Sequence, residues 1–171
     1  MIFLDASALV KAYVREPGSP SVHGAISRLQ GQLYLSRAVA LEVLSTLARK
    51  HRRDEITRGQ YTVARTSFLR ELEVKFKLLE LRETDFVAAF ALVDAYRRAG
   101  VGPLDVLHLA SALHLQAKTA DLVAVASSDG ALLAAARSAG LPTFDPEKQP
   151  LGALIALVQS PYPLRGSGVL R

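Results

Sequence analysis

The sequence offers chemistry mainly through four acidic residues, Asp5, Glu42, Asp105 and Asp129. Asp5 and Asp129 each follow a short apolar run, so both are expected where a buried strand ends and a helix begins. Each acid also has an ordinary structural explanation, because Asp is a favoured helix N-cap and Glu42 alone would pass as a solvated side chain.

Asp105 is the hardest of the four to explain structurally. It lies in a segment, residues 104–113, that is apolar almost all round and therefore predicts a buried helix. A carboxylate there costs several kcal/mol unless it is paired or bound to a metal. The alternative is that Asp105 stabilises the start of that helix, because it follows Pro103 closely.

Together, the acids predict one metal site. Carboxylates gathered in a cleft repel one another unless a cation neutralises them, and an all-oxygen ligand set suits Mg²⁺ or Mn²⁺. Such an ion can support hydrolysis of a phosphodiester bond by water, which indicates a nuclease. Ser7 is a candidate for a supporting hydroxyl. Lys11, Arg37 and Arg49 are candidates for phosphate contacts, although ordinary solvated charges explain them equally well.

The composition limits the class of protein. The chain has 171 residues, half of them hydrophobic, and a net charge of +5. It contains no cysteine, which excludes disulfides, Cys-ligated zinc and thiol catalysis. Residues 1–77 hold 13 Lys/Arg against 7 Asp/Glu, which favours a polyanionic partner or solvated helix ends. We expect a cytoplasmic protein, because the N-terminus does not look like a signal peptide and no apolar stretch suits a membrane span.

Alternating strand and helix patterns position the acids. Strands are predicted at residues 2–4, 32–36, 77–81, 122–127 and 142–144. Helices are predicted at residues 5–14, 19–30, 37–53, 84–100, 104–118 and 151–158, and two more begin at Thr57 and Asp129. This order predicts a three-layer α/β/α fold with a mainly parallel sheet, whose ligands bind at the carboxyl ends of the strands. In the 37–53 helix, Leu41, Leu44, Leu47 and Ala48 form the predicted core stripe, with Glu42 opposite.

Four segments resemble the PIN domain family, and within it the VapC-like toxins of toxin–antitoxin pairs. They are residues 2–11, 40–43, 104–110 and 125–129, in the family's order. The resemblance implies an Mg²⁺- or Mn²⁺-dependent endoribonuclease, a homodimer and a cognate antitoxin. It assigns the acidic cluster to Asp5, Glu42, Asp105 and Asp129, with Ser7 and Ser127 as supporting groups. The family often has Thr where Ser127 stands, which keeps the hydroxyl.

The remaining expectations concern boundaries and rival functions. Residues 1–149 are predicted to form the PIN-like domain, and 150–171 a C-terminal extension with one short helix and a mobile tail. His108 and His114 are expected to be core or interface histidines rather than ligands. One rival is a catalytically silent RNA- or partner-binding module on the same fold. A haloacid dehalogenase-type phosphatase fits less well, because that family needs a second Asp where Ser7 stands.

Overall fold

The computed structural model describes residues 1–97 and 100–159 of the chain. Within these residues the sheet has five strands, β1 (Ile2–Leu4), β2 (Leu33–Ser36), β3 (Lys77–Leu79), β4 (Ala124–Ala126) and β5 (Thr143–Phe144), in the order β3-β2-β1-β4-β5. Every neighbouring pair is parallel, as predicted. The helices are α1 (Ala6–Leu9), the 3₁₀ turn η1 (Val10–Ala12), α2 (Ser19–Arg28), α3 (Arg37–Arg52), α4 (Arg58–Lys75), α5 (Glu83–Tyr96), α6 (Pro103–Thr119), α7 (Gly130–Ser138) and α8 (Leu151–Gln159).

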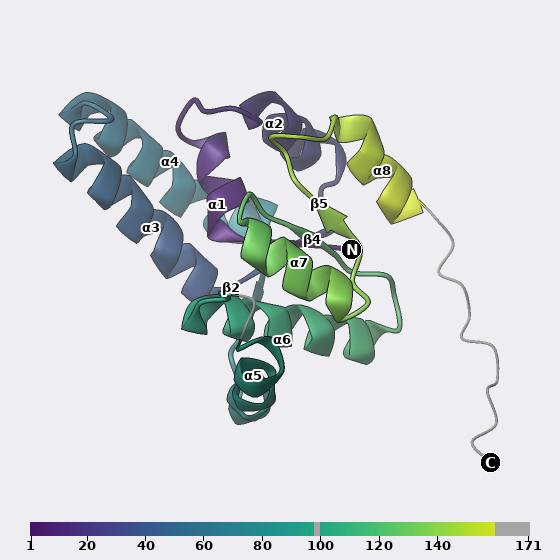
Figure 1. Ribbon diagram of the computed structural model, residues 1–171. Coiled ribbons are helices and arrows are strands. Elements are labelled where there is room, and N and C mark those ends of the chain that lie inside the picture. The colour runs from purple at the N-terminus through teal and green to yellow at the C-terminus, as the bar shows by residue number, and fades with distance from the viewer. Residues whose placement is uncertain (98–99, 160–171) are drawn as a thin grey trace, which may run out of the picture.

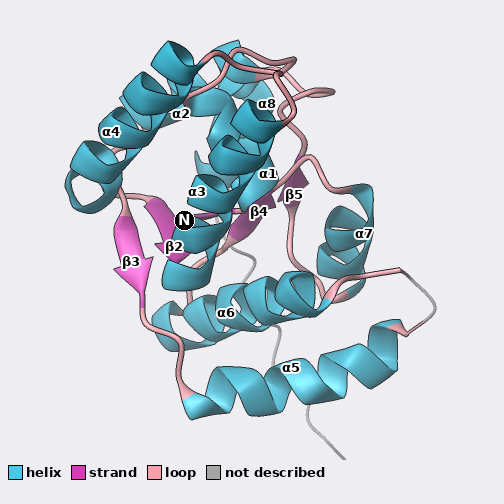
Figure 2. Cartoon of the chain, turned by 90° about the vertical axis from the view of Figure 1, so that its left-hand side faces the viewer, coloured by secondary structure: helices cyan, strands magenta, loops and turns pink. Residues whose placement is uncertain are grey.

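The helices form two layers, one on each face of the sheet. Figures 1 and 2 show α1 to α4 and α8 on one face, and α5 and α6 on the other with α7 beside them. This division follows from connectivity, since right-handed crossovers place helices on opposite faces when the chain moves in opposite directions along the sheet. The α/β/α architecture that the sequence predicts is confirmed.

The point where the chain changes direction lies between β1 and β4. These strands pair directly, with Leu4 opposite Ala126 in the register. Both strands are fully buried, which explains why short unbroken apolar runs encode them. Because both are parallel, Asp5 and Asp129 emerge at the same edge of the sheet, where such folds bind ligands.

Local sequence signals explain several helix boundaries. Thr57 caps α4 through a capping box with Gln60, as the Thr signal predicts. The helix predicted to begin at Thr84 instead starts at Glu83, with Asp85 accepting a hydrogen bond from the Arg82 amide. The first helix, predicted to run continuously to residue 14, is a short α1 followed by the tighter turn η1.

The predicted core stripe of α3 is wrong in part. Leu41 is 68% exposed and Ala48 is also exposed, whereas the buried residues are Val39, Ala40, Val43 and Leu47. Apolar residues occur all round the first half of this helix, so two stripes were available at helical spacing. Contacts with α1 and the sheet select the stripe that includes Val43.

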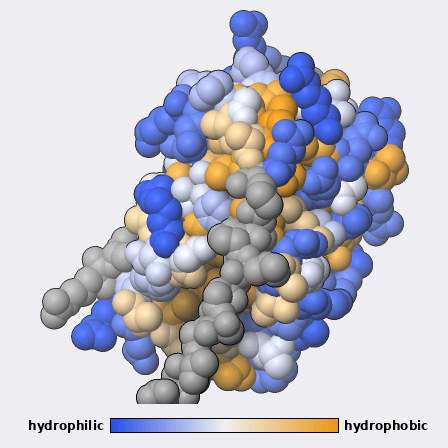
Figure 3. All heavy atoms as spheres, turned by 90° about the vertical axis from the view of Figure 1, so that its right-hand side faces the viewer, coloured by the Kyte–Doolittle hydropathy of each residue, from blue (hydrophilic) through white to orange (hydrophobic). Residues whose placement is uncertain are grey.

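Helix α8 packs on α2 and buries Leu154 in the main core. Figure 3 shows hydrophobic side chains gathered on the face where α8 lies. The predicted helix of the C-terminal extension is therefore present, whereas the predicted mobile tail, residues 160–171, lies outside the described residues. A domain boundary at residue 149 stays a prediction. Within the described residues, no helix has the length and apolar character that crossing a membrane requires.

Candidate active site

A cavity of about 590 Å³ opens at the carboxyl ends of the central strands. All four acids singled out from the sequence line it, brought there by the end of β1, by α3, by the start of α6 and by the loop after β4. Six carboxylate side chains and three cationic ones line the cavity: Asp5, Glu16, Glu42, Asp105, Asp129 and Glu147, with Lys11, Arg49 and Lys50. The cavity therefore has an excess of negative charge, although the chain as a whole is basic.

Asp5 is the most enclosed of the acids. It caps α1 through the Ser7 backbone amide, and its carboxylate also accepts hydrogen bonds from the hydroxyls of Ser7 at 2.5 Å and Ser127 at 2.9 Å. Burial alone would raise the pKa of Asp5, but hydrogen bonds from His108, Ser7 and Ser127 together hold that pKa below its usual value. Asp5 is therefore both a helix cap and an ionised group facing the cavity.

The two serines connect Asp5 to the loop after β4. The Ser127 hydroxyl donates to Asp5 and accepts a hydrogen bond from the Asp129 amide at 2.9 Å. Likewise, the Ser7 hydroxyl accepts from the Ser128 amide at 2.8 Å and lies 3.1 Å from the Ser127 hydroxyl. The serines thus fix the strand-end loops of β1 and β4 relative to each other.

His108 lies between two of the acids. Its Nδ1 is 3.3 Å from an Asp5 carboxylate oxygen, and its Nε2 is 3.2 Å from Oε2 of Glu42. The contact with Glu42 does not have hydrogen-bond geometry, so Oε2 of Glu42 is buried without a hydrogen-bond partner in the described part of the chain. Burial raises the pKa of Glu42; nearby His108 lowers it, while Asp5 and Asp105 raise it further, and the net direction is upward.

Asp105 and Asp129 both lie at the start of a helix, Asp105 as the third residue of α6 and Asp129 as the N-cap of α7. Asp105 accepts a hydrogen bond from the Gly102 amide at 3.0 Å, and Asp129 accepts two from the amides of Ala131 and Leu132. Burial raises the pKa of Asp105 and the charges of Asp5 and Asp129 add to the effect, although the Gly102 hydrogen bond opposes it. Each of these acids can therefore stabilise the start of a helix and also contribute a carboxylate to the cavity.

The donor set fits a cation. Ligand atoms of Asp5, Asp105 and His108 all lie within 4.8 Å of one another. Glu42 contributes a buried carboxylate oxygen that lacks a hydrogen-bond partner among residues 1–97 and 100–159. Because Glu42 and Asp105 both have raised pKa values in this arrangement, an added positive charge would stabilise their ionised forms.

The three predicted phosphate contacts lie in different surroundings. Lys11 is buried and its ammonium forms ion pairs with Glu16 at 3.1 Å and Glu147 at 2.6 Å. Arg49 lines the cavity and donates to the Thr46 hydroxyl. Arg37 does not line the cavity, and its exposed guanidinium pairs with Glu80.

Sequence reasoning missed three residues that belong to the surroundings of the site. His108 is a buried core histidine, as expected, but it also contacts Asp5 and Glu42. Its spacing of three residues from Asp105 places both on one helix face, and that signal was present in the sequence. Glu147 gave no comparable signal, because its contact with Lys11 joins segments 136 residues apart, whereas Glu16 lies only five residues after Lys11.

Comparisons with known proteins agree with this architecture. The family model of the PIN domain matches residues 2–138. Among solved structures, FitAcB from Neisseria gonorrhoeae is similar at 19% identity and a TM-score of 0.64, over 87% of this chain and 100% of that one. VapC20 from Mycobacterium tuberculosis, a toxin that cleaves the sarcin–ricin loop, is similar at 14% identity and a TM-score of 0.62, over 88% and 100%.

A third structure, VapBC2 from Rickettsia felis bound to a DNA fragment from its promoter, is similar at 14% identity and a TM-score of 0.60. That likeness covers 85% of this chain and 98% of that one. No curated protein matches the chain significantly. At these identities the solved structures show a shared fold, and the family model shows the family.

Proposed function

The chain belongs to the PIN domain family, and on this premise we propose that it is a metal-dependent endoribonuclease that hydrolyses RNA phosphodiester bonds. The observation that carries the proposal is the convergence of Asp5, Glu42, Asp105 and Asp129 on one cavity. Four separate elements supply these acids, and a purely structural role for each would not require them to meet. Family membership also removes the haloacid dehalogenase alternative.

We propose Mg²⁺ or Mn²⁺ as the cofactor, held by Asp5, Glu42 and Asp105, with Asp129 acting directly or through water. When bound, the ion would make water a better nucleophile and offset charge on the phosphate. Hard cations prefer oxygen ligands, so His108 is better suited to orient Asp5 and Glu42 than to bind Mg²⁺ itself. Its two ring nitrogens face one carboxylate each, which fixes the separation of those two acids.

The cationic residues of the cavity would hold the RNA backbone. Arg49 and Lys11 line the same cavity as the acids, so a phosphate near the acids lies within the same enclosure. Lys11 would have to exchange one of its two carboxylate partners for the phosphate, and Glu147 is the more exposed of the two. Arg37 would act only on RNA that extends beyond the cavity.

Partners and location form the second part of the proposal. We propose that the protein is the toxin of a VapBC-type pair, inhibited by a cognate antitoxin, and acts in the cytoplasm. The support is family membership together with the fold shared with VapC20 and VapBC2. A small DNA-binding protein encoded next to this chain, binding it and suppressing RNA cleavage, would be the expected finding.

We also propose a homodimer that uses helix α5. Its side chains Phe86, Val87, Phe90 and Val93 are between 40% and 67% exposed, and they recur at helical spacing. Exposed apolar patches of this kind mark contact surfaces. Light scattering should give twice the monomer mass for the wild type and the monomer mass for Phe90→Glu. A monomeric wild type would reject the dimer.

RNA cleavage with Mg²⁺, Mn²⁺ or EDTA tests the central proposal. The wild type should cleave RNA with either metal and stop in EDTA, and Asp5→Asn should be inactive while folded. Asp94→Asn, an exposed acid on α5, is the matched control and should cleave like the wild type. Equal cleavage by Asp5→Asn, or undiminished cleavage in EDTA, would reject the proposed site. RNA binding without cleavage would favour the silent binding module.

A further inference from the structure

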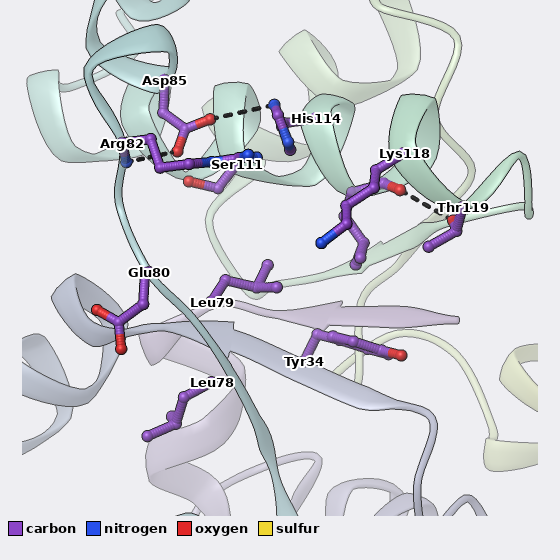
Figure 4. Close-up of a pocket in the computed structure, with 11 residues that line it drawn as sticks. Tyr34, Leu78, Leu79, Glu80, Arg82, Asp85, Ser111, His114, Lys118 and Thr119 are labelled. Atoms are coloured by element: carbon purple, nitrogen blue, oxygen red, sulfur yellow. Dashed lines mark hydrogen bonds and ion pairs between the residues drawn. The ribbon is translucent and has the colours of Figure 1, made fainter.

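A second cavity, of about 410 Å³, lies between helix α6 and strands β2 and β3, and the start of α5 closes one end. It shares no lining residue with the carboxylate cavity. Figure 4 shows its side chains converging from these elements. Its volume lies within the range of pockets that bind small molecules and cofactors.

Two cations on opposite sides of this cavity are available to a ligand. Arg82 precedes α5 and Lys118 lies near the end of α6, and both line the cavity. Neither side chain forms an ion pair with any residue in the ranges 1–97 and 100–159, unlike Arg37, which already pairs with the lining residue Glu80. In Figure 4 the Lys118 side chain extends toward Tyr34. A ligand with an anionic group would satisfy these cations.

A buried acid beside the cavity orients a third polar group. The Asp85 side chain is 4% exposed, and its Oδ1 lies 3.5 Å from Nδ1 of His114. Oδ2 of Asp85 accepts a hydrogen bond from the Arg82 amide, whereas Oδ1 has no hydrogen-bond partner in the described ranges. Buried polar atoms without partners are rare in folded proteins. Since Asp85 faces Nδ1, the Nε2 atom of His114 remains for a ligand.

The sheet side of this cavity is largely apolar. Tyr34, Leu78 and Leu79 line it there, and Leu115 adds an apolar side chain from α6. Lys77 fixes the Tyr34 ring, because its ammonium donates to the phenol oxygen at 3.3 Å and lies 5.3 Å from the ring centre. A ring held in one orientation beside leucines suits the flat face of a base, which stacks on aromatic side chains.

We propose that this cavity binds one nucleotide unit, with the base against Tyr34 and the phosphate at Arg82, His114 and Lys118. This combination of a fixed aromatic ring and leucines with unpaired cations fits a nucleotide better than a purely apolar ligand or a bare anion. The unit is either a free mononucleotide or one nucleotide of the RNA substrate. The alternative in which the nucleotide belongs to the RNA substrate rests on the proposed ribonuclease function.

Helix α6 connects the two cavities. It carries Asp105 at its start and His114 nine residues later, which corresponds to roughly 13 Å along the helix axis. Nine residues are also about two and a half turns, so these side chains leave opposite sides of α6, and an RNA strand that reaches both passes around the helix over several nucleotides. In this arrangement the second cavity reads a base outside the bond that is cleaved.

Mononucleotide binding tests the site without relying on cleavage. AMP, UMP and inorganic phosphate are titrated into the full-length chain without metal, while NMR follows the amides of Arg82, His114 and Lys118. At least one mononucleotide should give saturable shifts there, and inorganic phosphate should bind much more weakly. Lys118→Met should weaken binding about tenfold or more, since it removes a charged hydrogen bond. Lys75→Met, at the end of α4 and outside the cavity lining, should leave it unchanged.

An RNA arm distinguishes the two sources. If the site reads RNA, Lys118→Met raises KM for a long RNA and leaves kcat and the cleavage of a dinucleotide unchanged. If the site binds free nucleotides, the variant loses mononucleotide binding while KM stays the same. No saturable shift with any mononucleotide, equal binding of phosphate alone, or equal affinity in Lys118→Met and Lys75→Met would overturn the proposal. Because binding is measured without metal, failure of the nuclease proposal would not affect this result.

Discussion

Removing the Ser127 hydroxyl should destabilise the metal-free protein by about 2–4 kcal/mol at pH 7. Ser127 is fully buried, and its hydroxyl donates to the ionised Asp5 carboxylate while accepting from the Asp129 amide. Hydrogen bonds to charged groups contribute about 1.5–3 kcal/mol, and a buried amide left unpaired costs about 1–3 kcal/mol. The total falls below the sum because Ser7 still donates to Asp5.

The cleanest comparison is Ser127→Val with Ser127→Thr. Both add a methyl group at Cβ, and Val also replaces the hydroxyl with a second methyl of similar size, so the difference between the two variants isolates the hydroxyl. Urea unfolding followed by circular dichroism in EDTA buffer gives the free energy of unfolding for each. Thr66→Val on the exposed side of α4 is the control and should change stability by less than about 0.5 kcal/mol.

The difference should also depend on pH. The Asp5 pKa is held below its usual value, so the hydrogen bond to the ionised form stabilises the fold above the unfolded pKa of about 3.9. This stabilisation is lost as the pH falls through the lowered folded pKa. The difference in free energy of unfolding between the Thr and Val variants should therefore be constant above about pH 5 and become smaller in acid. What remains in acid is the contribution of the hydrogen bond from the Asp129 amide. A difference under about 1 kcal/mol at pH 7, or one that does not narrow, would refute the reasoning.

Three further predictions follow from contacts near the site. Gly18→Ala should destabilise the fold by about 1–3 kcal/mol, because φ is +86° and a Cβ would lie 2.7 Å from the Pro146 backbone. The control Gly59→Ala on α4 should instead stabilise the fold by about 0.5–1 kcal/mol. Urea unfolding measures the free energy of unfolding of both variants. In the same assay Lys11→Met should cost about 2 kcal/mol or more, whereas Glu147→Gln should cost under about 1 kcal/mol because that carboxylate is 39% exposed. Mg²⁺ at about 100 times its Kd should stabilise the wild type by about 2.7 kcal/mol in thermal unfolding, and an equal gain in Asp5→Asn would contradict the proposed ligand set.

The strand-end acids and the buried helix α6 could be predicted because single segments encode them. Ile2–Leu4 before Asp5 and the apolar run before Asp129 already indicate where a parallel sheet ends. Asp105 was identifiable because its neighbours on α6 are almost all buried. Each of these predictions depends on residues that are adjacent in the chain.

Features that depend on tertiary contacts could not be predicted in the same way. The α3 stripe was misassigned because local periodicity allowed two solutions and only packing selects Val43 over Leu41. The pairing of Lys11 with Glu147 joins η1 to the loop between β5 and α8, and the sequence near either residue gives no sign of it. His108 is intermediate, because its spacing from Asp105 was visible but its position between Asp5 and Glu42 was not.

The central position of β1 has a consequence for how the protein is made. Strand β1 is synthesised well before its partner β4, and Asp5 meets Ser127 across 122 residues of sequence. Until that later segment has been synthesised, Asp5 lacks its hydroxyl partners from the β4 loop and Asp129 is absent. Long-range pairing of this kind also forms slowly. A nascent chain therefore cannot assemble the acidic cluster before β4 and Asp129 have been synthesised, and any ribonuclease activity of that cluster begins only after that point.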